Sequence, residues 1–172
     1  MMISKQNIEM GIGRFGLISK NDRRFFLKAK RVAQISDFYK THVGCIAVYK
    51  NTIIGMGCNA EKTHPLQLYY NQYRLNDSEL LPKIHAEISC ISSIRHLDIN
   101  FQKVKLYIYR TRCDQEFGMA RPCPSCLAAI KDLGIENVYY TTNDGYAYEF
   151  IKNNRDYSKR ERLYYANTLS VL

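Results

Sequence analysis

The chain has 172 residues, of which 46% are hydrophobic and 24% are charged, a composition typical of a globular domain with a sizeable core. It has no run of about 18 apolar residues, which argues against a membrane-spanning helix. Residues 1–13 lack the apolar stretch of a secretory signal peptide, so we expect a cytoplasmic protein. We predict one domain over residues 1–172, with a core at about 22–150 and a basic tail at 151–172.

The net charge of +9 is concentrated at the two ends of the chain. Residues 1–40 hold nine Lys or Arg against three Asp or Glu, and residues 151–172 hold five against two. Residues 41–150 hold eleven of each and are neutral. Basic surfaces contact phosphate groups in nucleotides or nucleic acids. A solvated surface with no binding role explains the same charge equally well.

The first predicted element is an amphipathic helix that begins near Asp22. Its apolar side chains recur every three to four residues, and basic side chains fill most other positions. We expect Asn21 or Asp22 to cap its N-terminus. Two β-rich segments, 43–49 and 53–56, follow and predict a hairpin that turns at residues 50–51.

The longest segment without a periodic pattern is 59–82. It is polar and tyrosine-bearing, and we interpret Pro65 and Pro82 as breakers. A loop of this length is usually functional. The elements after it alternate between helix and strand: helix 84–97, strand 104–109, loop 110–121, helix 124–133 ending at Gly134, strands 137–142 and 146–151, and a last helix from Lys152. This order predicts an α/β fold with helices on both faces of a mixed sheet.

Two short motifs, His-Ala-Glu and Pro-Cys-Pro-Ser-Cys, each open a predicted helix. Cys123 and Cys126 lie three residues apart on a first turn, so their sulfurs lean the same way and the helix N-terminus favours thiolates. Together with His85 they make three zinc ligands and leave the fourth position to water, as catalytic zinc requires. Glu87 supplies a carboxylate that is not a ligand and is suited to proton transfer.

The remaining cysteines allow one alternative. A closed structural zinc site would use Cys113 as its fourth ligand. Cys45, Cys58 and Cys90 lie in apolar stretches and are predicted to be small buried side chains. In a reducing compartment we do not expect the six cysteines to form a disulfide framework.

The combined motifs resemble those of the zinc-dependent cytidine and deoxycytidylate deaminase superfamily, with the deoxycytidylate deaminase-type members the most similar. The resemblance covers most of residues 22–150, including the first helix and the hairpin. It implies a three-layer α/β/α fold with a mixed five-stranded sheet. It also implies that His85, Cys123 and Cys126 hold Zn²⁺ and that Glu87 is the proton shuttle.

The resemblance also implies contacts with the substrate. The backbone amide of Ala86 would face the base, and the side chain of Asn59 would contact the sugar. We further predict that His64 or Arg121 meets a phosphate group and that Tyr70 stacks on a base. The spacing of 38 residues from His85 to the second motif is longer than in many members, which leaves the size of the substrate open.

Three functions compete. The first is hydrolytic deamination of cytosine to uracil in a free nucleotide such as dCMP. The second is deamination of cytosine, or less readily adenine, in single-stranded DNA or RNA, which the basic ends and fourteen tyrosines favour. The third is a deaminase-like fold that only binds, against which an intact Glu87 argues. A homo-oligomer is also expected.

Overall fold

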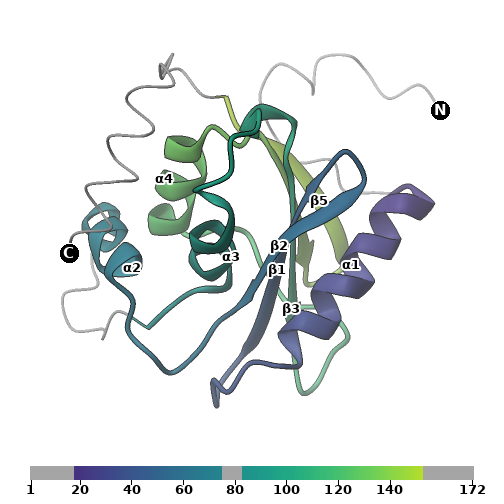
Figure 1. Ribbon diagram of the computed structural model, residues 1–172. Coiled ribbons are helices and arrows are strands. Elements are labelled where there is room, and N and C mark those ends of the chain that lie inside the picture. The colour runs from purple at the N-terminus through teal and green to yellow at the C-terminus, as the bar shows by residue number, and fades with distance from the viewer. Residues whose placement is uncertain (1–17, 75–82, 153–172) are drawn as a thin grey trace.

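The computed structural model describes residues 18–74 and 83–152 (Figure 1). Its strands form a five-stranded sheet in the order β2-β1-β3-β4-β5, in which β3 and β4 are parallel and the other neighbours antiparallel. The strands are β1 (His42–Tyr49), β2 (Thr52–Cys58), β3 (Lys105–Thr111), β4 (Asn137–Thr142) and β5 (Gly145–Phe150). The helices are α1 (Lys20–Ala33), α2 (Pro65–Tyr70), α3 (Ala86–Ile94) and α4 (Pro124–Leu133), with 3-10 turns η2 (Asn71–Tyr73) and η3 (Phe101–Lys103).

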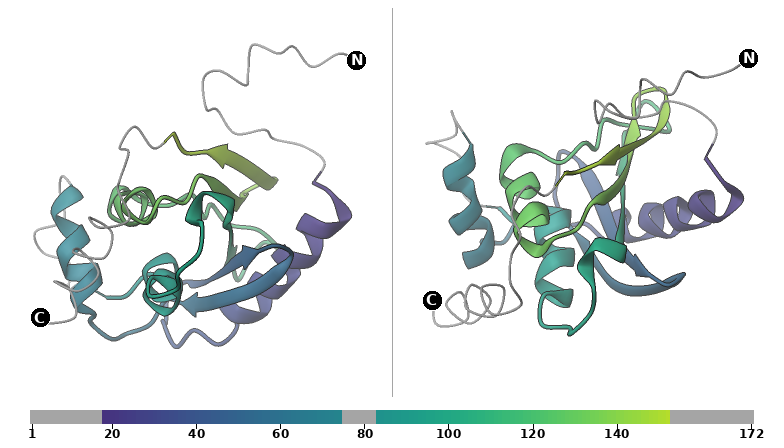
Figure 2. Two further views of the ribbon diagram at one scale, coloured as in Figure 1. Left: turned by 45° about the horizontal axis from the view of Figure 1, so that its top comes forward. Right: turned by 90° about the horizontal axis from the view of Figure 1, so that it is seen from above.

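The helices lie on both faces of the sheet. Helix α1 covers one face, whereas α2, α3 and α4 lie on the other (Figures 1 and 2). Successive side chains of β1 alternate between the two cores: Cys45 and Ala47 pack with α3, and Ile46 and Val48 pack with α1. The predicted three-layer α/β/α fold with a mixed five-stranded sheet is therefore confirmed.

The β1–β2 hairpin forms as predicted. Lys50 and Asn51 have φ angles of 48° and 64°, the left-handed conformation that a tight two-residue hairpin turn requires. On β2, a Cβ atom at Gly57 would overlap the backbone nitrogen of Cys90 and the side chain of Ser89. The missing side chain thus lets α3 lie directly against the hairpin, which positions the first motif.

The expected cap of the first helix is wrong by a few residues. Helix α1 begins at Lys20, and the Oγ atom of Ser19 accepts a hydrogen bond of 3.0 Å from the backbone N–H of Asp22. The Asp22 carboxylate accepts one hydrogen bond from the Ser19 hydroxyl and another of 2.6 Å from the hydroxyl of Tyr107 on β3. Asp22 therefore lies inside the first turn and joins the N-terminus of α1 to a strand residue 85 positions away in sequence.

The predicted loop at 59–82 is also corrected, because it contains α2 and η2. Pro65 occupies the first turn of α2, where a missing N–H costs nothing, so it starts a helix rather than breaking one. His64 is the N-cap, and its Nδ1 atom accepts a hydrogen bond of 3.1 Å from the backbone of Leu66. Pro82 and the expected last helix beyond Lys152 lie outside the described residues.

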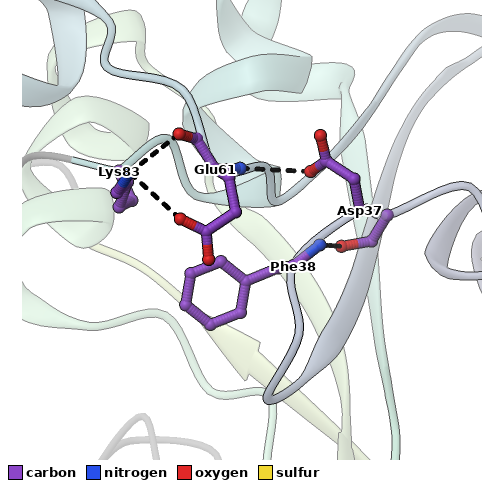
Figure 3. A network of polar contacts seen from close by, with 5 residues as sticks. Asp37, Phe38, Glu61 and Lys83 are labelled. Atoms are coloured by element: carbon purple, nitrogen blue, oxygen red, sulfur yellow. Dashed lines mark hydrogen bonds and ion pairs between the residues drawn. The ribbon is translucent and has the colours of Figure 1, made fainter.

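The two ends of this segment are tied together at its base. The backbone N–H of Ile84 donates to Lys62 O at 2.9 Å. The ammonium of Lys83 donates to Glu61 O at 2.8 Å and lies 3.0 Å from the Glu61 carboxylate, as Figure 3 shows. The N–H of Glu61 in turn donates to the carboxylate of Asp37. These contacts fix the chain immediately before His85.

Helix α4 and strand β4 have the predicted bounds, and the other strands begin or end within two residues of expectation. Gly134 ends α4 in the left-handed conformation, with a φ of 85°. Within residues 18–74 and 83–152, no helix has the length and apolar character needed to cross a membrane.

Candidate metal centre

Both motif helices begin at a predicted metal ligand. His85 is the N-cap of α3 and Cys123 is the N-cap of α4, and neither side chain caps its own helix. The two side chains are therefore available to turn toward each other. The Nδ1 atom of His85 lies 3.6 Å from the sulfur of Cys123 and 3.4 Å from that of Cys126. The structure thus brings together three side chains that the sequence separates by up to 41 residues.

This geometry fits tetrahedral zinc. With Zn–S bonds of about 2.3 Å and Zn–N bonds of about 2.05 Å, a tetrahedral angle places sulfur and nitrogen about 3.6 Å apart. The observed separations of 3.6 and 3.4 Å match that value. The ligand atoms of His85, Cys123 and Cys126 all lie within 4.8 Å of one another. Two soft thiols with one imidazole form a donor set that zinc prefers.

The two thiols of this centre differ in their acidity. A hydrogen bond from Cys126 lowers the pKa of the Cys123 thiol to about 4 against the opposing effect of burial, and interactions with His85 lower it further. Burial, followed by the hydrogen bond to Cys123, raises the pKa of Cys126 well above its usual range. Burial lowers the pKa of His85, but the hydrogen bond to Cys123 and the charge of Glu87 raise it overall. The two ligand thiols are therefore inequivalent, and Cys123 is the more acidic of them.

Glu87 lies next to this centre without belonging to the ligand cluster. It is the second residue of α3 and is only 6% exposed. Burial raises the pKa of its carboxyl group, although the charge of His85 opposes the shift. Its side chain interacts with the thiol of Cys126. A buried carboxyl group with a raised pKa beside a metal site has the properties of an acid or base.

The other cysteines do not extend the site. Cys113 is exposed and is not part of the metal-binding cluster found among the described residues, so the closed four-ligand alternative finds no support. Cys45 and Cys90 are buried as predicted. Cys58 is only partly buried, because it ends the edge strand β2, and the prediction is wrong for this residue.

A buried amide links the two motif segments, and the sequence did not predict it. Gln67 on α2 is fully buried. Its Oε1 atom accepts a hydrogen bond of 3.0 Å from the backbone N–H of His85. Its Nε2 atom donates to Ser125 at 3.0 Å and to Asn71 at 2.8 Å. The available sequence signal was Leu66 and Tyr70 at helical spacing after a proline, which would have placed Gln67 on a short helix.

Asn59 and Ala86 lie near the ends of elements that border the centre. The Asn59 side chain is 8% exposed and is hydrogen-bonded within the fold. Its Nδ2 atom donates to Thr41 O at 2.8 Å, and its Oδ1 atom accepts from Val43 N and Ser36 Oγ, each at 2.8 Å. Ala86 is fully buried as the first residue of α3. Their contacts with a sugar and a base stay predictions.

The other three predicted substrate residues have partners within the fold. His64 caps α2 through Nδ1. Tyr70 is 6% exposed, and burial, followed by interactions with Asp132, raises its pKa. The guanidinium of Arg121 makes two hydrogen bonds of 2.8 Å to the carboxylate of Glu149 on β5. Any substrate contact through these groups has to compete with the bonds that they already make.

Residues 19–142 match the family model described as the cytidine and deoxycytidylate deaminase zinc-binding region. The fold is similar to that of the dCMP deaminase from the cyanophage S-TIM5 in its apo form, at 20% identity over 72% of this chain and 84% of that one, with a TM-score of 0.51. It is also similar to that of the cytidine deaminase from Burkholderia pseudomallei, at 16% identity over 77% and 93%, with a TM-score of 0.52. None of the curated proteins matches the chain.

The family match spans the helix, hairpin and both motifs around which the metal centre is built. At these sequence identities, the similarity to the solved structures supports the fold assignment alone. The chain belongs to the zinc-dependent cytidine and deoxycytidylate deaminase superfamily and is a zinc-dependent hydrolase of the deaminase type.

Proposed function

We propose that this protein deaminates the cytosine ring of a free cytidine or deoxycytidine nucleotide, such as dCMP, to the uracil form. The observation that carries the proposal is the convergence of His85, Cys123 and Cys126, with the buried carboxyl group of Glu87 beside them. Three ligands leave one position of a tetrahedral metal open. A closed structural site has no use for an adjacent buried acid.

The proposal gives each of these residues a role. His85, Cys123 and Cys126 hold Zn²⁺, which supplies a Lewis acid that makes water nucleophilic near neutral pH. A carboxylate oxygen of Glu87 accepts a proton from the attacking water and delivers it to the ring nitrogen N3. As the bond from C4 to the amino group breaks, Glu87 takes the remaining water proton from the hydroxyl group on C4 and passes it to the departing nitrogen. One water is consumed and one ammonia is released.

The raised pKa of Glu87 suits this cycle. A carboxyl group that burial makes less acidic holds a proton more readily between the two transfer steps. The same burial excludes bulk water from the proton path. Two further proposed contacts are carried over from the family resemblance. The Ala86 backbone amide faces the base, and the Asn59 side chain contacts the sugar.

The distribution of charge favours a free nucleotide over a polynucleotide. The most basic element, α1, covers the face of the sheet opposite α3 and α4, whose first turns carry the metal cluster (Figure 1). A single strand held by α1 would therefore have to pass around the sheet to reach the zinc. Arg74 is close enough to the centre for its charge to lower the pKa of His85, and we propose that it attracts the substrate phosphate.

A substrate panel tests the proposal. Zinc-loaded protein is offered cytidine, deoxycytidine, their 5′-monophosphates and a single-stranded oligonucleotide that contains cytosine, and ammonia release is measured. We expect the highest kcat/KM with a monophosphate. Activity on the oligonucleotide alone would replace the proposal with a polynucleotide deaminase. Binding without ammonia release from any substrate would favour a silent binding module.

A further inference from the structure

The amide of Gln67 connects the two segments that carry the metal ligands. We infer that Gln67 is a positioning residue, which sets the distance between His85 and the Cys123–Cys126 turn before zinc binds. The inference rests on the metal site in the proposed function but not on the identity of the substrate. It gives α2, which lies in a segment expected to be a substrate loop, a role in assembling the metal site.

The hydrogen bonds of Gln67 reach both sides of the centre. On the α3 side, Oε1 accepts from the N–H of His85, the residue that carries the imidazole. On the α4 side, Nε2 donates to Ser125, which lies between the two cysteines. One rigid side chain therefore joins the backbone of one ligand to the turn that carries the other two.

A fourth residue fixes the orientation of the amide. The Oδ1 atom of Asn71 accepts from Gln67 Nε2 at 2.8 Å and from Ser125 Oγ at 3.1 Å. Because Asn71 is the C-cap of α2, the triangle of Gln67, Asn71 and Ser125 ties the end of α2 to the start of α4. The amide oxygen is thereby aimed at His85, since both amide hydrogens are already used on the other side.

Because this hydrogen-bond network is buried, the loss of any one of its bonds is costly. Gln67 and Ser125 are fully buried. A buried amide is tolerated when its donors and acceptors are paired, and removal of one partner leaves the others unpaired in a low-dielectric site. Loss of the Gln67 amide would leave the backbone N–H of His85 without its acceptor. The His85 side chain makes no capping hydrogen bond to α3 that could hold the residue in place. Its imidazole would then sample positions away from the thiols.

Partners just outside the ligands of a metal typically contribute about 10–100-fold to its affinity. We therefore expect Gln67→Met, which keeps the volume but removes the hydrogen bonds, to weaken zinc binding by about 10–100-fold. The measurement is competition for Zn²⁺ with a chromophoric chelator, carried out without substrate. The absorption spectrum of the Co²⁺-loaded protein should change in parallel, because its bands report ligand geometry. The matched control is Leu68→Ala, since Leu68 is the next residue on α2 and is 62% exposed.

Ser125→Ala is the second variant and a milder one. It removes one hydrogen-bond partner of the amide and leaves the bond from His85 to Gln67 in place. If the residues act through one network, the loss in zinc affinity of the double variant should be smaller than the sum of the two single losses. This variant also decides the question if Gln67→Met does not fold, which the melting temperature of the zinc-free protein reveals.

A merely structural role for Gln67 would lower the melting temperature of the zinc-free protein and leave metal binding unchanged. The inference is overturned if folded Gln67→Met, or Ser125→Ala in its place, binds zinc within about twofold of the parent with an unchanged Co²⁺ spectrum. The absence of deamination in the substrate panel would contradict the proposed function, but it would not affect these two measurements.

Discussion

The two core clusters on either side of the sheet differ in what they bury. The cluster under α1 is aromatic: the ring of Tyr107 stacks on Tyr139 at 4.7 Å and contacts Phe25 and Phe26 at 5.2 and 5.5 Å. The face with α3 and α4 encloses a fully buried amide, a buried carboxyl group and two thiols with opposite shifts in pKa. The α1 face is therefore held by aromatic packing, whereas the opposite face combines the larger apolar core with buried polar groups suited to chemistry.

The difference has a physical basis. Aromatic side chains bury large areas and gain from edge and stacked contacts, so they stabilise whichever element they attach to the sheet. A buried polar group stabilises only when every partner is present. Variants of the polar groups at the metal centre should therefore change metal binding and turnover first, and changes in the aromatic cluster under α1 should alter stability first.

Removal of a ligand should have the largest effect. We expect His85→Ala or Cys123→Ala to lose stoichiometric zinc and to reduce turnover to background, because two ligands cannot hold zinc in a tetrahedral site. Zinc content by elemental analysis and ammonia release check this result. Cys113→Ser is the matched control, since Cys113 is exposed and lies outside the cluster. Loss of zinc in the control would instead revive the closed four-ligand site.

Replacement of the proposed proton carrier comes next. Glu87→Gln should retain zinc and fold but lose turnover by about 10²–10⁴-fold, because an amide cannot accept and return a proton. Zinc content, a thermal melt and kcat for the preferred substrate separate these effects. A variant that keeps most of its turnover would show that another group carries the proton.

On the α1 face, ionisation of buried tyrosines at alkaline pH should reduce the free energy of unfolding, independently of the metal centre. Burial, with the nearby charge of Asp22, raises the pKa of Tyr139 to about 12, and burial also raises the pKa of Tyr107 and Tyr109. In the unfolded chain the tyrosine pKa values are about 10, so the unfolded chain loses these protons at a lower pH than the folded protein does. The free energy of unfolding should therefore fall as pH rises from about 10 toward about 12.

Denaturant titrations of the parent and of Tyr139→Phe check this slope. The variant should show a shallower fall, because one shifted phenol is gone. A free energy of unfolding that stays constant across the interval would mean that the phenols ionise as readily in the folded protein as in the unfolded chain.

The smallest effect is expected from the outward charges of α1. Lys28→Gln combined with Arg31→Gln should change kcat/KM for a nucleotide by no more than about twofold, because both side chains are exposed on the helix across the sheet from the metal cluster. Steady-state rates on the monophosphate and on an oligonucleotide provide the comparison. A loss confined to the oligonucleotide would show that α1 binds single strands.

Local signals explain where the sequence predicted structure well. Pro124 and Gly134 bracket α4 with the residues that favour a helix start and a left-handed end, and the helix has those bounds. The ligand set was predictable because two cysteines at a spacing of three on a first turn share a direction whatever surrounds them. The hairpin turn at Lys50 and Asn51 is local in the same sense.

The partners that the sequence did not predict belong to side chains whose contacts lie far along the chain. Asp22 lies in the first turn of α1, which Ser19 caps, and its carboxylate accepts a hydrogen bond from Tyr107 on β3. Arg121 stays a candidate for phosphate binding, although Glu149 on β5 pairs with it. Tyr70 stays a candidate for stacking, although it is only 6% exposed. In each case the residue type was suited to both roles.

By itself, the sequence predicted the candidate zinc ligands, the adjacent carboxylate and the order of the helices and strands other than α2 and the 3-10 turns, because these predictions rest on residue type and short-range spacing. Only the tertiary structure decided that α2 exists as a helix packed beside the motifs and that Gln67 joins His85 to Ser125. It also decided that the basic helix α1 lies across the sheet from α3 and α4, whose first turns carry the candidate metal ligands (Figure 1). Local patterns fix which groups are present, whereas the packing of layers across the sheet fixes which of them meet.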